Sequence, residues 1–279
     1  MTKKGIIIIS ILTTLLILTG VLFGFVFCLR KQKVTIVGEN IAYSPQAIIN
    51  TAGLKNGEPI FLIDKEKAIN KIESTFKDIK VIQIKTTSVT EIEIKVRNRY
   101  KTYYYENLGS YFILDEDLKV LEKIEIKKDN ASVVENLVYI DEDLTEVALE
   151  KINVKTNVAD FIGSNTQQKI CYNLFTTVYE TQMETETGLD ARVKMSSLIS
   201  SISFDTGYTQ SGKSHNKLIV KTKEGITFEI GKADKDLYRK VYACFEAMKS
   251  DKVEDKSKGS IIVDFDANDK EFIYYSKGE

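Results

Sequence analysis

The stretch from Ile79 to Arg99, IKVIQIKTTSVTEIEIKVRNR, decides how the N-terminal part of this 279-residue chain folds. Apolar and polar residues alternate from Ile79 to Thr86, apart from the additional apolar residue Ile82, and again from Glu91 to Arg97. A period of two puts alternate side chains on opposite faces of a strand, which is typical of a sheet with one buried face. We therefore predict two half-buried strands that follow one another in the chain.

Upstream of this stretch, the pattern changes to that of one strand and two helices. Residues Lys33–Val37 alternate and predict a short strand. Ser44-Pro45 supplies an N-cap serine and a proline at the first helical position, and Gly53 supplies a C-terminal stop. Asp64 is a second N-cap, and the helix predicted after it, Lys65–Phe76, has apolar residues at helical spacing. The predicted order is β-α-α-β-β.

The N-terminus carries an uncharged run from Gly5 to Leu29. At about 1.5 Å per residue, such a run spans a hydrocarbon core of about 30 Å with some tilt. A cleaved signal peptide would end in small residues, whereas this run ends in Phe25-Val26-Phe27-Cys28. We predict a retained transmembrane helix with a cytoplasmic N-terminus and the bulk of the chain outside the plasma membrane. Flanking charge alone does not decide the orientation, because lysines lie on both sides of the run.

The remainder of the chain predicts a second, mostly antiparallel β domain with flanking helices. Its predicted helices are Gln167–Glu184 and Asp234–Met248, and residues 125–160 are weakly patterned. Its predicted strands are Tyr100–Glu106, Ser110–Leu114, Lys119–Leu121, Leu198–Phe204, Lys217–Lys223, Ile226–Ile230, Ile261–Phe265 and Glu271–Tyr275. The fold class that follows is α+β.

Charge and residue counts exclude several classes of function. Residues 1–33 hold five basic side chains and no acid, which leaves 34 basic and 40 acidic groups in the rest of the chain. This balance does not favour nucleic acid, whose binding needs a basic face. The single histidine, His215, rules out a two-histidine zinc site, so we predict no metal and no cofactor. Cys171 and Cys244 lie in predicted helices, where we expect them to be free and buried.

Residues 207–214, GYTQSGKS, match the phosphate-binding loop pattern GxxxxGK[ST]. A working loop needs a helix that starts at Gly212-Lys213, because the helical amides and dipole hold the phosphates. The tract that follows, HNKLIVKTKEG, alternates as a strand does. We therefore favour a polar hairpin loop, and an exported nucleotide-using enzyme is the weakest alternative.

Acidic pairs and a tyrosine cluster are the other candidate sites. The pairs Asp115/Asp117 and Asp141/Asp143 have spacings that general acid–base chemistry can use, but no pocket motif accompanies them, so we expect turn and surface roles and no catalytic residue. The cluster Tyr103-Tyr104-Tyr105 with Tyr111 and Phe112 is either a recognition face or a set in which alternate members pack the sheet. We favour packing.

Three tracts together resemble the POTRA domain of the bacterial cell-division proteins FtsQ and DivIB. They are Val34–Asn40 (VTIVGEN), Ser44–Ile48 (SPQAI) and Gly53–Phe61 (GLKNGEPIF). Val89–Arg99 is similar to the closing strand of that domain, although Arg97-Asn98-Arg99 stands where the family usually has Glu-Arg. Further on, Gly109–Asp115, Glu224–Gly231, Lys240–Met248 and Gly259–Phe265 are similar to segments of the family's β domain.

The resemblance implies three segments and a non-catalytic function. The segments are a cytoplasmic stub with a transmembrane helix (1–29), a POTRA domain (30–99) and an FtsQ/DivIB-like β domain (100–279). The implied protein is a divisome scaffold at the septum that binds FtsL-like and FtsB/DivIC-like coiled-coil proteins and helps control septal peptidoglycan synthesis, with the POTRA domain contacting other divisome components. The implied partner-binding residues are Lys270, Glu271, Phe272, Ile273, Tyr274 and Tyr275, in a terminal strand that is a plausible sheet edge. A POTRA-containing export or spore-envelope assembly factor is the alternative.

Overall fold

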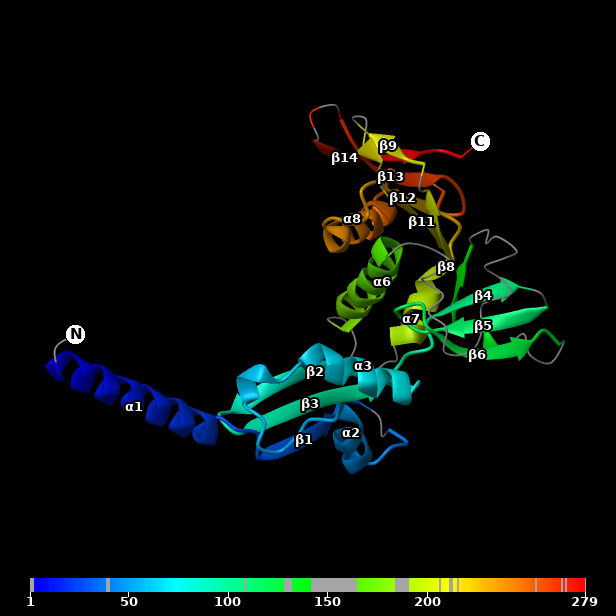
Figure 1. Ribbon diagram of the computed structural model, residues 1–279. Helices are drawn as coiled ribbons and strands as arrows, with labels where there is room; N and C mark the ends of the chain where they lie inside the picture. Colours follow the sequence, from blue (N-terminus) through cyan, green and yellow to red (C-terminus); the bar gives the residue numbers. More distant parts are fainter. Residues whose placement is uncertain are drawn as a thin grey trace. The chain divides into compact units, whose positions relative to one another are not determined.

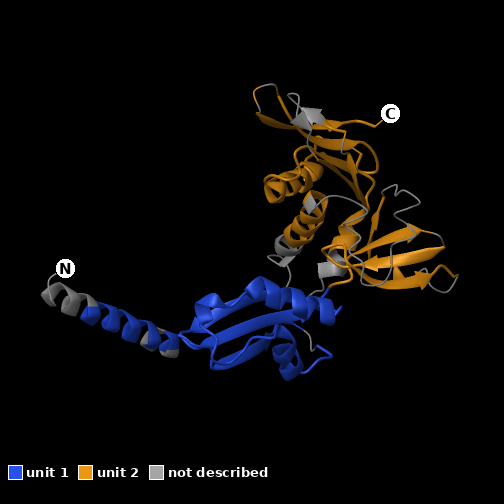
Figure 2. Cartoon of the chain, in the orientation of Figure 1, with its two compact units in different colours: residues 1–99 blue, residues 100–279 orange. Residues whose placement is uncertain are grey.

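The structure is a computed structural model. It describes residues 3–38, 41–107, 109–127, 132–141, 165–183, 191–205, 207–210, 213–214, 216–253, 255–266, 268 and 270–278. The chain divides into two compact units, Met1–Arg99 and Tyr100–Glu279, which Figure 2 shows in blue and orange. Each unit has a hydrophobic core of its own. The predicted mixed α+β class is confirmed.

The first unit contains helices α1 (Lys3–Val26), α2 (Pro45–Ala52) and α3 (Lys65–Thr75), the short 3-10 helix η1 (Ile60–Leu62), and strands β1 (Lys31–Ile36), β2 (Ile79–Ser88) and β3 (Glu91–Asn98). After α1, this is the predicted β-α-α-β-β order (Figure 1). The sheet order is β1-β3-β2, with β1 parallel and β2 antiparallel to β3. The alternating isoleucines of the deciding stretch, Ile79, Ile92 and Ile94, are fully buried.

Local signals fix the ends of the two short helices. Ser44 Oγ accepts a hydrogen bond from the Ala47 amide, and Asp64 Oδ1 accepts one from the Lys67 amide, so both predicted N-caps are confirmed. Gly53 ends α2 with φ of 67°, a left-handed conformation that glycine adopts without steric cost. The buried Arg99 donates to the Ile79 carbonyl at 3.0 Å and to Glu73 at 2.5 Å, which ties the last residue of the unit to β2 and α3.

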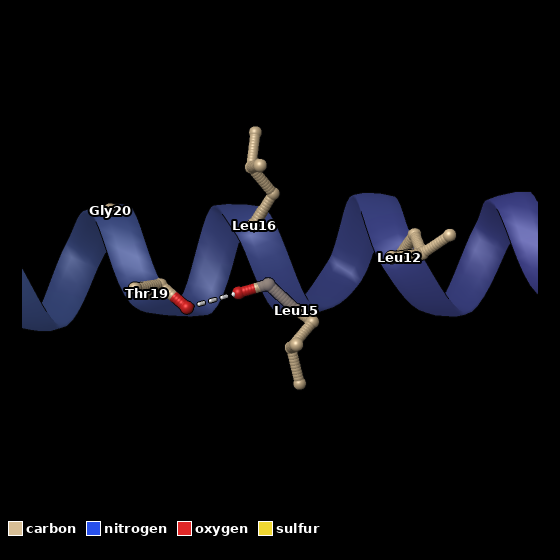
Figure 3. Close-up of a pocket in the computed structure, with 5 residues that line it drawn as sticks. All are labelled: Leu12, Leu15, Leu16, Thr19 and Gly20. Carbon is tan, nitrogen blue, oxygen red and sulfur yellow. Dashed lines mark hydrogen bonds between the residues drawn. The ribbon is translucent and has the colours of Figure 1, made fainter.

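Helix α1 exposes large apolar side chains, among them Leu15 (64 %) and Leu16 (76 %). Figure 3 shows these two residues on opposite sides of the helix, with Thr19 Oγ1 donating to the Leu15 carbonyl at 2.7 Å. Leu15, Leu16 and Thr19, together with Leu12 and Gly20, line a hollow of about 260 Å³. All five lining residues belong to α1. Within the described residues, no helix is both long and apolar enough to cross a membrane. The predicted transmembrane span is therefore not confirmed.

The second unit is built on a nine-stranded sheet with the order β14-β13-β12-β11-β8-β7-β4-β5-β6. These strands are β4 (Tyr103–Asn107), β5 (Ser110–Leu114), β6 (Val120–Glu125), β7 (Val138–Ile140), β8 (Ile199–Asp205), β11 (Lys217–Thr222), β12 (Thr227–Ile230), β13 (Ser260–Phe265) and β14 (Glu271–Ser276). Five neighbouring pairs are antiparallel, and three are parallel.

Helices α6 (Asn165–Met183), α7 (Ala191–Leu198) and α8 (Leu237–Lys249) complete the core of this unit (Figure 1). They contribute residues such as Leu174, Met195 and Val241, which pack with the inward-facing residues of the strands. Helix α8 begins three residues after the predicted start at Asp234. Lys232 and Asp236 both have positive φ, so the chain turns here before the helix begins.

A candidate partner-binding sheet edge

Strand β14 is the last strand of the nine-stranded sheet, and it pairs antiparallel with β13 (Figure 1, red and orange). The register joins Asp264 to Phe272, Ile262 to Tyr274 and Ser260 to Ser276. No other described strand pairs with β14, so its second side is a free edge within that part of the chain. A free edge offers backbone donors and acceptors in a row to an incoming strand.

The register also decides which backbone groups of β14 face outward. The Asp266 amide donates to the Lys270 carbonyl at 2.9 Å, so these two residues form a hydrogen-bonded pair at the end of the ladder. Hydrogen-bonded and non-hydrogen-bonded pairs alternate along an antiparallel ladder. The backbone groups of Phe272 and Tyr274 therefore face β13, and those of Glu271, Ile273 and Tyr275 face away from it.

The side chains of β14 divide between the two faces of the sheet. Phe272 and Tyr274 share the face away from the core, with exposed fractions of 42 % and 44 %, and their rings stack with centroids 5.7 Å apart. Ile273, 39 % exposed, lies on the opposite face. Tyr275 on that face packs against the core, and its hydroxyl donates to the Lys258 carbonyl at 3.2 Å. The edge thus exposes the stacked rings of Phe272 and Tyr274, while the neighbouring Tyr275 is held against the core.

An ion pair connects the edge strand to α8. Arg239 donates to Glu271 at 2.6 Å. On the same helix Lys240 is buried, and its Nζ donates to the carbonyls of Gly231 and Lys232 at 3.1 and 2.8 Å. Burial lowers the pKa of Lys240. Arg239 thus connects α8 to β14, and Lys240 connects it to the segment that follows β12, so a helix supports the edge.

A hydrogen bond between Tyr208 and Asp264 lies on the outer face next to the aromatic pair Phe272 and Tyr274. Tyr208 donates a hydrogen bond to Asp264, the residue that faces Phe272 across the ladder. Burial, with the Asp264 hydrogen bond as second cause, raises the pKa of Tyr208. Sequence reasoning missed this residue. It lies 56 positions before Asp264, and no local pattern connects the two.

The structure gathers five of the six predicted site residues, Glu271–Tyr275, into β14. Lys270 precedes the strand, where its amide donates to Asp266 Oδ1 at 2.8 Å. Phe272, Ile273 and Tyr274 are exposed, whereas Glu271 and Tyr275 are partly covered. Binding of a partner at these residues stays a prediction.

The described residues of the phosphate-loop pattern, 207–210 and 213–214, include two short paired strands. Thr209–Gln210 (β9) and Lys213–Ser214 (β10) pair antiparallel, with Lys213 opposite Gln210. The helix that nucleotide binding requires would have to begin where β10 lies. The predicted hairpin pairing is confirmed, and it does not fit the helix on which the nucleotide-using alternative depends. His215 lies outside the described residues.

The acidic pair Asp115/Asp117 belongs to a turn, as predicted. Asp115 is buried and accepts hydrogen bonds from the amides of Asp117 and Lys119, both at 2.8 Å. These bonds close the turn between β5 and β6. Asp141 accepts a hydrogen bond from Lys221 at 3.3 Å on the surface, and Asp143 lies outside the described residues.

The tyrosine cluster packs the sheet on both faces. Tyr103 and Phe112 are buried in the core, and the Tyr103 hydroxyl donates to the Cys171 carbonyl at 2.8 Å. Burial raises the pKa of Tyr103 well above its usual value. Tyr104, on the other face, contacts Tyr111 and Tyr139 with ring centroids 5.9 and 5.2 Å away. The favoured packing interpretation is confirmed for Tyr103 and Phe112.

Cys171 and Cys244 are buried, as predicted, and no disulfide bond joins them. Burial raises the pKa of the Cys244 thiol to about 12. A thiol with such a pKa stays protonated at neutral pH and is a poor nucleophile. Both residues therefore serve as small core side chains.

Comparison with known families identifies the domain formed by the first unit after α1. Residues 29–99, about a quarter of the chain, match the family model of the POTRA domain of FtsQ type. No curated protein matches the chain. The matched range begins at the buried Leu29 and ends at the buried Arg99, so it covers the folded part of the first unit after α1. The chain carries a POTRA domain of the FtsQ type, and this domain confirms the predicted resemblance to the FtsQ/DivIB family of bacterial cell-division proteins.

Proposed function

We propose that this protein is a non-catalytic scaffold of the divisome that holds FtsL-like and FtsB/DivIC-like coiled-coil proteins and so helps control septal peptidoglycan synthesis. The FtsQ-type POTRA domain at residues 29–99 supports a role in cell division. The single observation that carries the docking role is the aromatic strand β14, which pairs on one side only among the described strands.

The proposed organisation has three segments with different tasks. Residues 1–29 anchor the chain in the plasma membrane at the septum, with the N-terminus in the cytoplasm. The uncharged run from Gly5 to Leu29 in the sequence supports this anchor. Residues 30–99 form the POTRA domain, which contacts other divisome components, and residues 100–279 form the FtsQ/DivIB-like β domain that binds the coiled-coil partners.

The proposed docking mode at Lys270–Tyr275 is addition of a partner segment to β14. The outward backbone groups of Ile273 are central to this mode, because they can bond an added strand without loss of any bond to β13. Phe272 and Tyr274 offer an apolar contact beside that strand, as aromatic residues do in interfaces.

The test uses one proline at each end of the nine-stranded sheet. Ile273→Pro removes an outward N–H from β14, and proline is tolerated on an edge strand in that orientation. The control is Glu125→Pro in β6: Ile126 donates to the Gly109 carbonyl, so the neighbouring Glu125 N–H also faces outward. Both variants should fold, as circular dichroism of the full chain in detergent would show.

The measurement is co-purification of the full chain with tagged FtsL-like and FtsB/DivIC-like proteins. We expect Ile273→Pro to weaken the complex at least about tenfold, which corresponds to about 1.4 kcal/mol, and Glu125→Pro to leave it unchanged. Retention of the complex by Ile273→Pro would refute docking at β14. Failure of the unmodified chain to bind these proteins, together with a fluorescent fusion that does not collect at mid-cell, would favour an export or envelope-assembly role.

A further inference from the structure

The short helix η1 exposes the two apolar residues at its end. Phe61 is 65 % and Leu62 is 66 % exposed, although Ile60 before them and Ile63 after them are buried. These fractions exceed those of Phe272 and Tyr274 on the candidate docking edge. Two adjacent apolar side chains with this much exposure indicate a contact surface if they lie close to an apolar medium, such as a membrane or a protein partner.

Backbone hydrogen bonds hold η1 against the segment that follows α1. The Ile60 amide donates to the Phe27 carbonyl, the Leu29 amide to the Glu58 carbonyl and the Gly57 amide to the Leu29 carbonyl, each at 2.8 Å. Cys28 and Pro59 form an antiparallel bridge between these bonds. Leu29 itself is fully buried in the POTRA core. The position of η1 relative to the end of α1 is therefore fixed by the backbone.

A third exposed apolar residue belongs to another segment that is hydrogen-bonded to the chain just after α1. The Thr90 carbonyl, in the turn between β2 and β3, accepts hydrogen bonds from the amides of Arg30 and Lys31 at 2.8 and 3.1 Å. The residue before it, Val89, is 49 % exposed. We call Phe61, Leu62 and Val89 the α1-proximal rim, because each belongs to a segment that is bonded to residues 27–31.

Distances along the backbone place this rim within reach of a lipid headgroup layer. Helix α1 ends at Val26, and the strand-like pairing of residues 27–29 with 57–60 separates the two segments by about 4.8 Å. The headgroup region adds about 5–8 Å to each side of a 30 Å hydrocarbon core. A POTRA domain tied to the end of a membrane anchor in this way brings Phe61 and Leu62 to the interface. Aromatic and apolar side chains are favoured at that depth.

We propose that the α1-proximal rim inserts into the surface of the phospholipid bilayer and so fixes the POTRA domain against the membrane. This inference rests on the proposed anchoring of residues 1–29. Arg30 and Lys31 are exposed beside the rim, and their charges suit the phosphates of the headgroups, with Lys31 Nζ also 3.6 Å from Glu91. The rim is thus an amphipathic contact: apolar side chains that enter the interface, next to basic ones that meet the phosphates.

The chain contains no tryptophan, so a single introduced tryptophan reports its own environment. Phe61→Trp places the probe in the rim. Ile82→Trp is the matched control, because Ile82 is also exposed (46 %) but lies six residues along β2 from Ser88, about 20 Å from the β2–β3 turn. Both full-length variants are reconstituted into phosphatidylcholine–phosphatidylglycerol vesicles, with or without bromine on the lipid acyl chains.

We expect bromine to quench most of the emission of Phe61→Trp, which should also shift to the blue on reconstitution, and to leave Ile82→Trp unchanged. Flotation of the vesicles first tests the anchor: a full-length chain that does not float refutes the proposed anchoring. A chain that floats while Phe61→Trp stays unquenched refutes the lipid contact alone. A blue-shifted but unquenched Phe61→Trp means that protein covers the rim, and this too overturns the proposal.

Discussion

The two ends of the nine-stranded sheet use aromatic residues in opposite ways. At the β6 end, Tyr103 and Phe112 point into the core and are 0 % and 2 % exposed. At the β14 end, Phe272 and Tyr274 point away from the core and are 42 % and 44 % exposed. The same residue types therefore stabilise the fold at one end and remain available for binding at the other.

The two edge strands differ in charge as well. Three of the six residues of β6, Glu122, Lys123 and Glu125, are charged, and Glu122 and Glu125 form ion pairs with Lys101 and Lys127 at 2.7 and 2.9 Å. In β14 the only charged residue is Glu271, at its first position. Charged residues along an edge prevent strand addition. This difference in charge supports the proposal that β14 is the end of the sheet to which a partner strand is added.

The largest effect is expected for an aromatic residue at the β6 end. Phe112→Ala removes a side chain from the core, and truncation of a buried phenylalanine costs about 3–5 kcal/mol of unfolding free energy. That is a large part of the 5–15 kcal/mol typical of a folded protein. Denaturant unfolding of the full chain, followed by circular dichroism, would measure the loss. A loss below 1 kcal/mol would mean that the β6 end contributes little to the core.

The same truncation at the β14 end should act on binding and not on folding. Phe272→Ala removes an exposed ring, so we expect the unfolding midpoint to stay where it is. We expect affinity for the FtsB/DivIC-like partner to fall about tenfold, or about 1.4 kcal/mol, as for an aromatic interface residue. Titration calorimetry with both proteins would measure it. Equal destabilisation by Phe272→Ala and Phe112→Ala would remove the distinction between the two ends.

A pH experiment tests the burial of Tyr103. Burial raises the pKa of Tyr103 well above the usual 10, so the folded state holds this proton more tightly than the unfolded state does. The resulting stability is fully present below pH 10 and is lost as the pH rises above it. Tyr103→Phe removes the hydroxyl that bonds to Cys171, at a cost of about 1 kcal/mol near neutral pH.

The expected signature in Tyr103→Phe is a shallower loss of stability above pH 10 than in the unmodified chain. Urea unfolding at several pH values would show it. Tyr104→Phe is the graded control, because the pKa of Tyr104 is also raised by burial, but its side chain is only partly buried. Identical alkaline profiles for Tyr103→Phe and the unmodified chain would contradict the role given to Tyr103.

Local signals made most of the fold predictable. The caps at Ser44 and Asp64 and the alternation from Glu91 to Arg97 depend on neighbours within a few residues, and the structure has them as predicted. In β2 the alternation is interrupted at Ile82, which is exposed where the register with β3 shifts. Strand β7 (Val138–Ile140) was missed, because three residues are too few to show a period and its pairing with β4 and β8 is parallel and long-range. Strand β6 was predicted too short, at Lys119–Leu121, whereas it extends to Glu125. Its second half is mostly charged and shows no apolar pattern, but pairing with β5 keeps it in the sheet.

The candidate site was predictable as a strand but not as a surface. The β-branched and aromatic residues of Glu271–Tyr275 predict β structure, yet only the register with β13 shows that Phe272 and Tyr274 lie on the outer face. Tyr208 and Arg239 come from distant segments, so no spacing in the sequence could have connected them to this edge. Long-range pairing supplied that part of the site.

The smallest effect is expected for the ion pair that connects α8 to the edge. Arg239 is 63 % exposed in its pair with Glu271, and exposed pairs contribute about 0–1 kcal/mol. Arg239→Ala should therefore leave the unfolding midpoint nearly unchanged and alter partner affinity less than about threefold, which is about 0.65 kcal/mol. Lys249→Ala, which breaks the pair with Glu246 within α8, is the matched control. A much larger loss of partner affinity for Arg239→Ala than for Lys249→Ala would show that the docking edge depends on α8. In that case the ion pair would be holding Glu271, and with it the neighbouring aromatic pair, in the position that the partner binds.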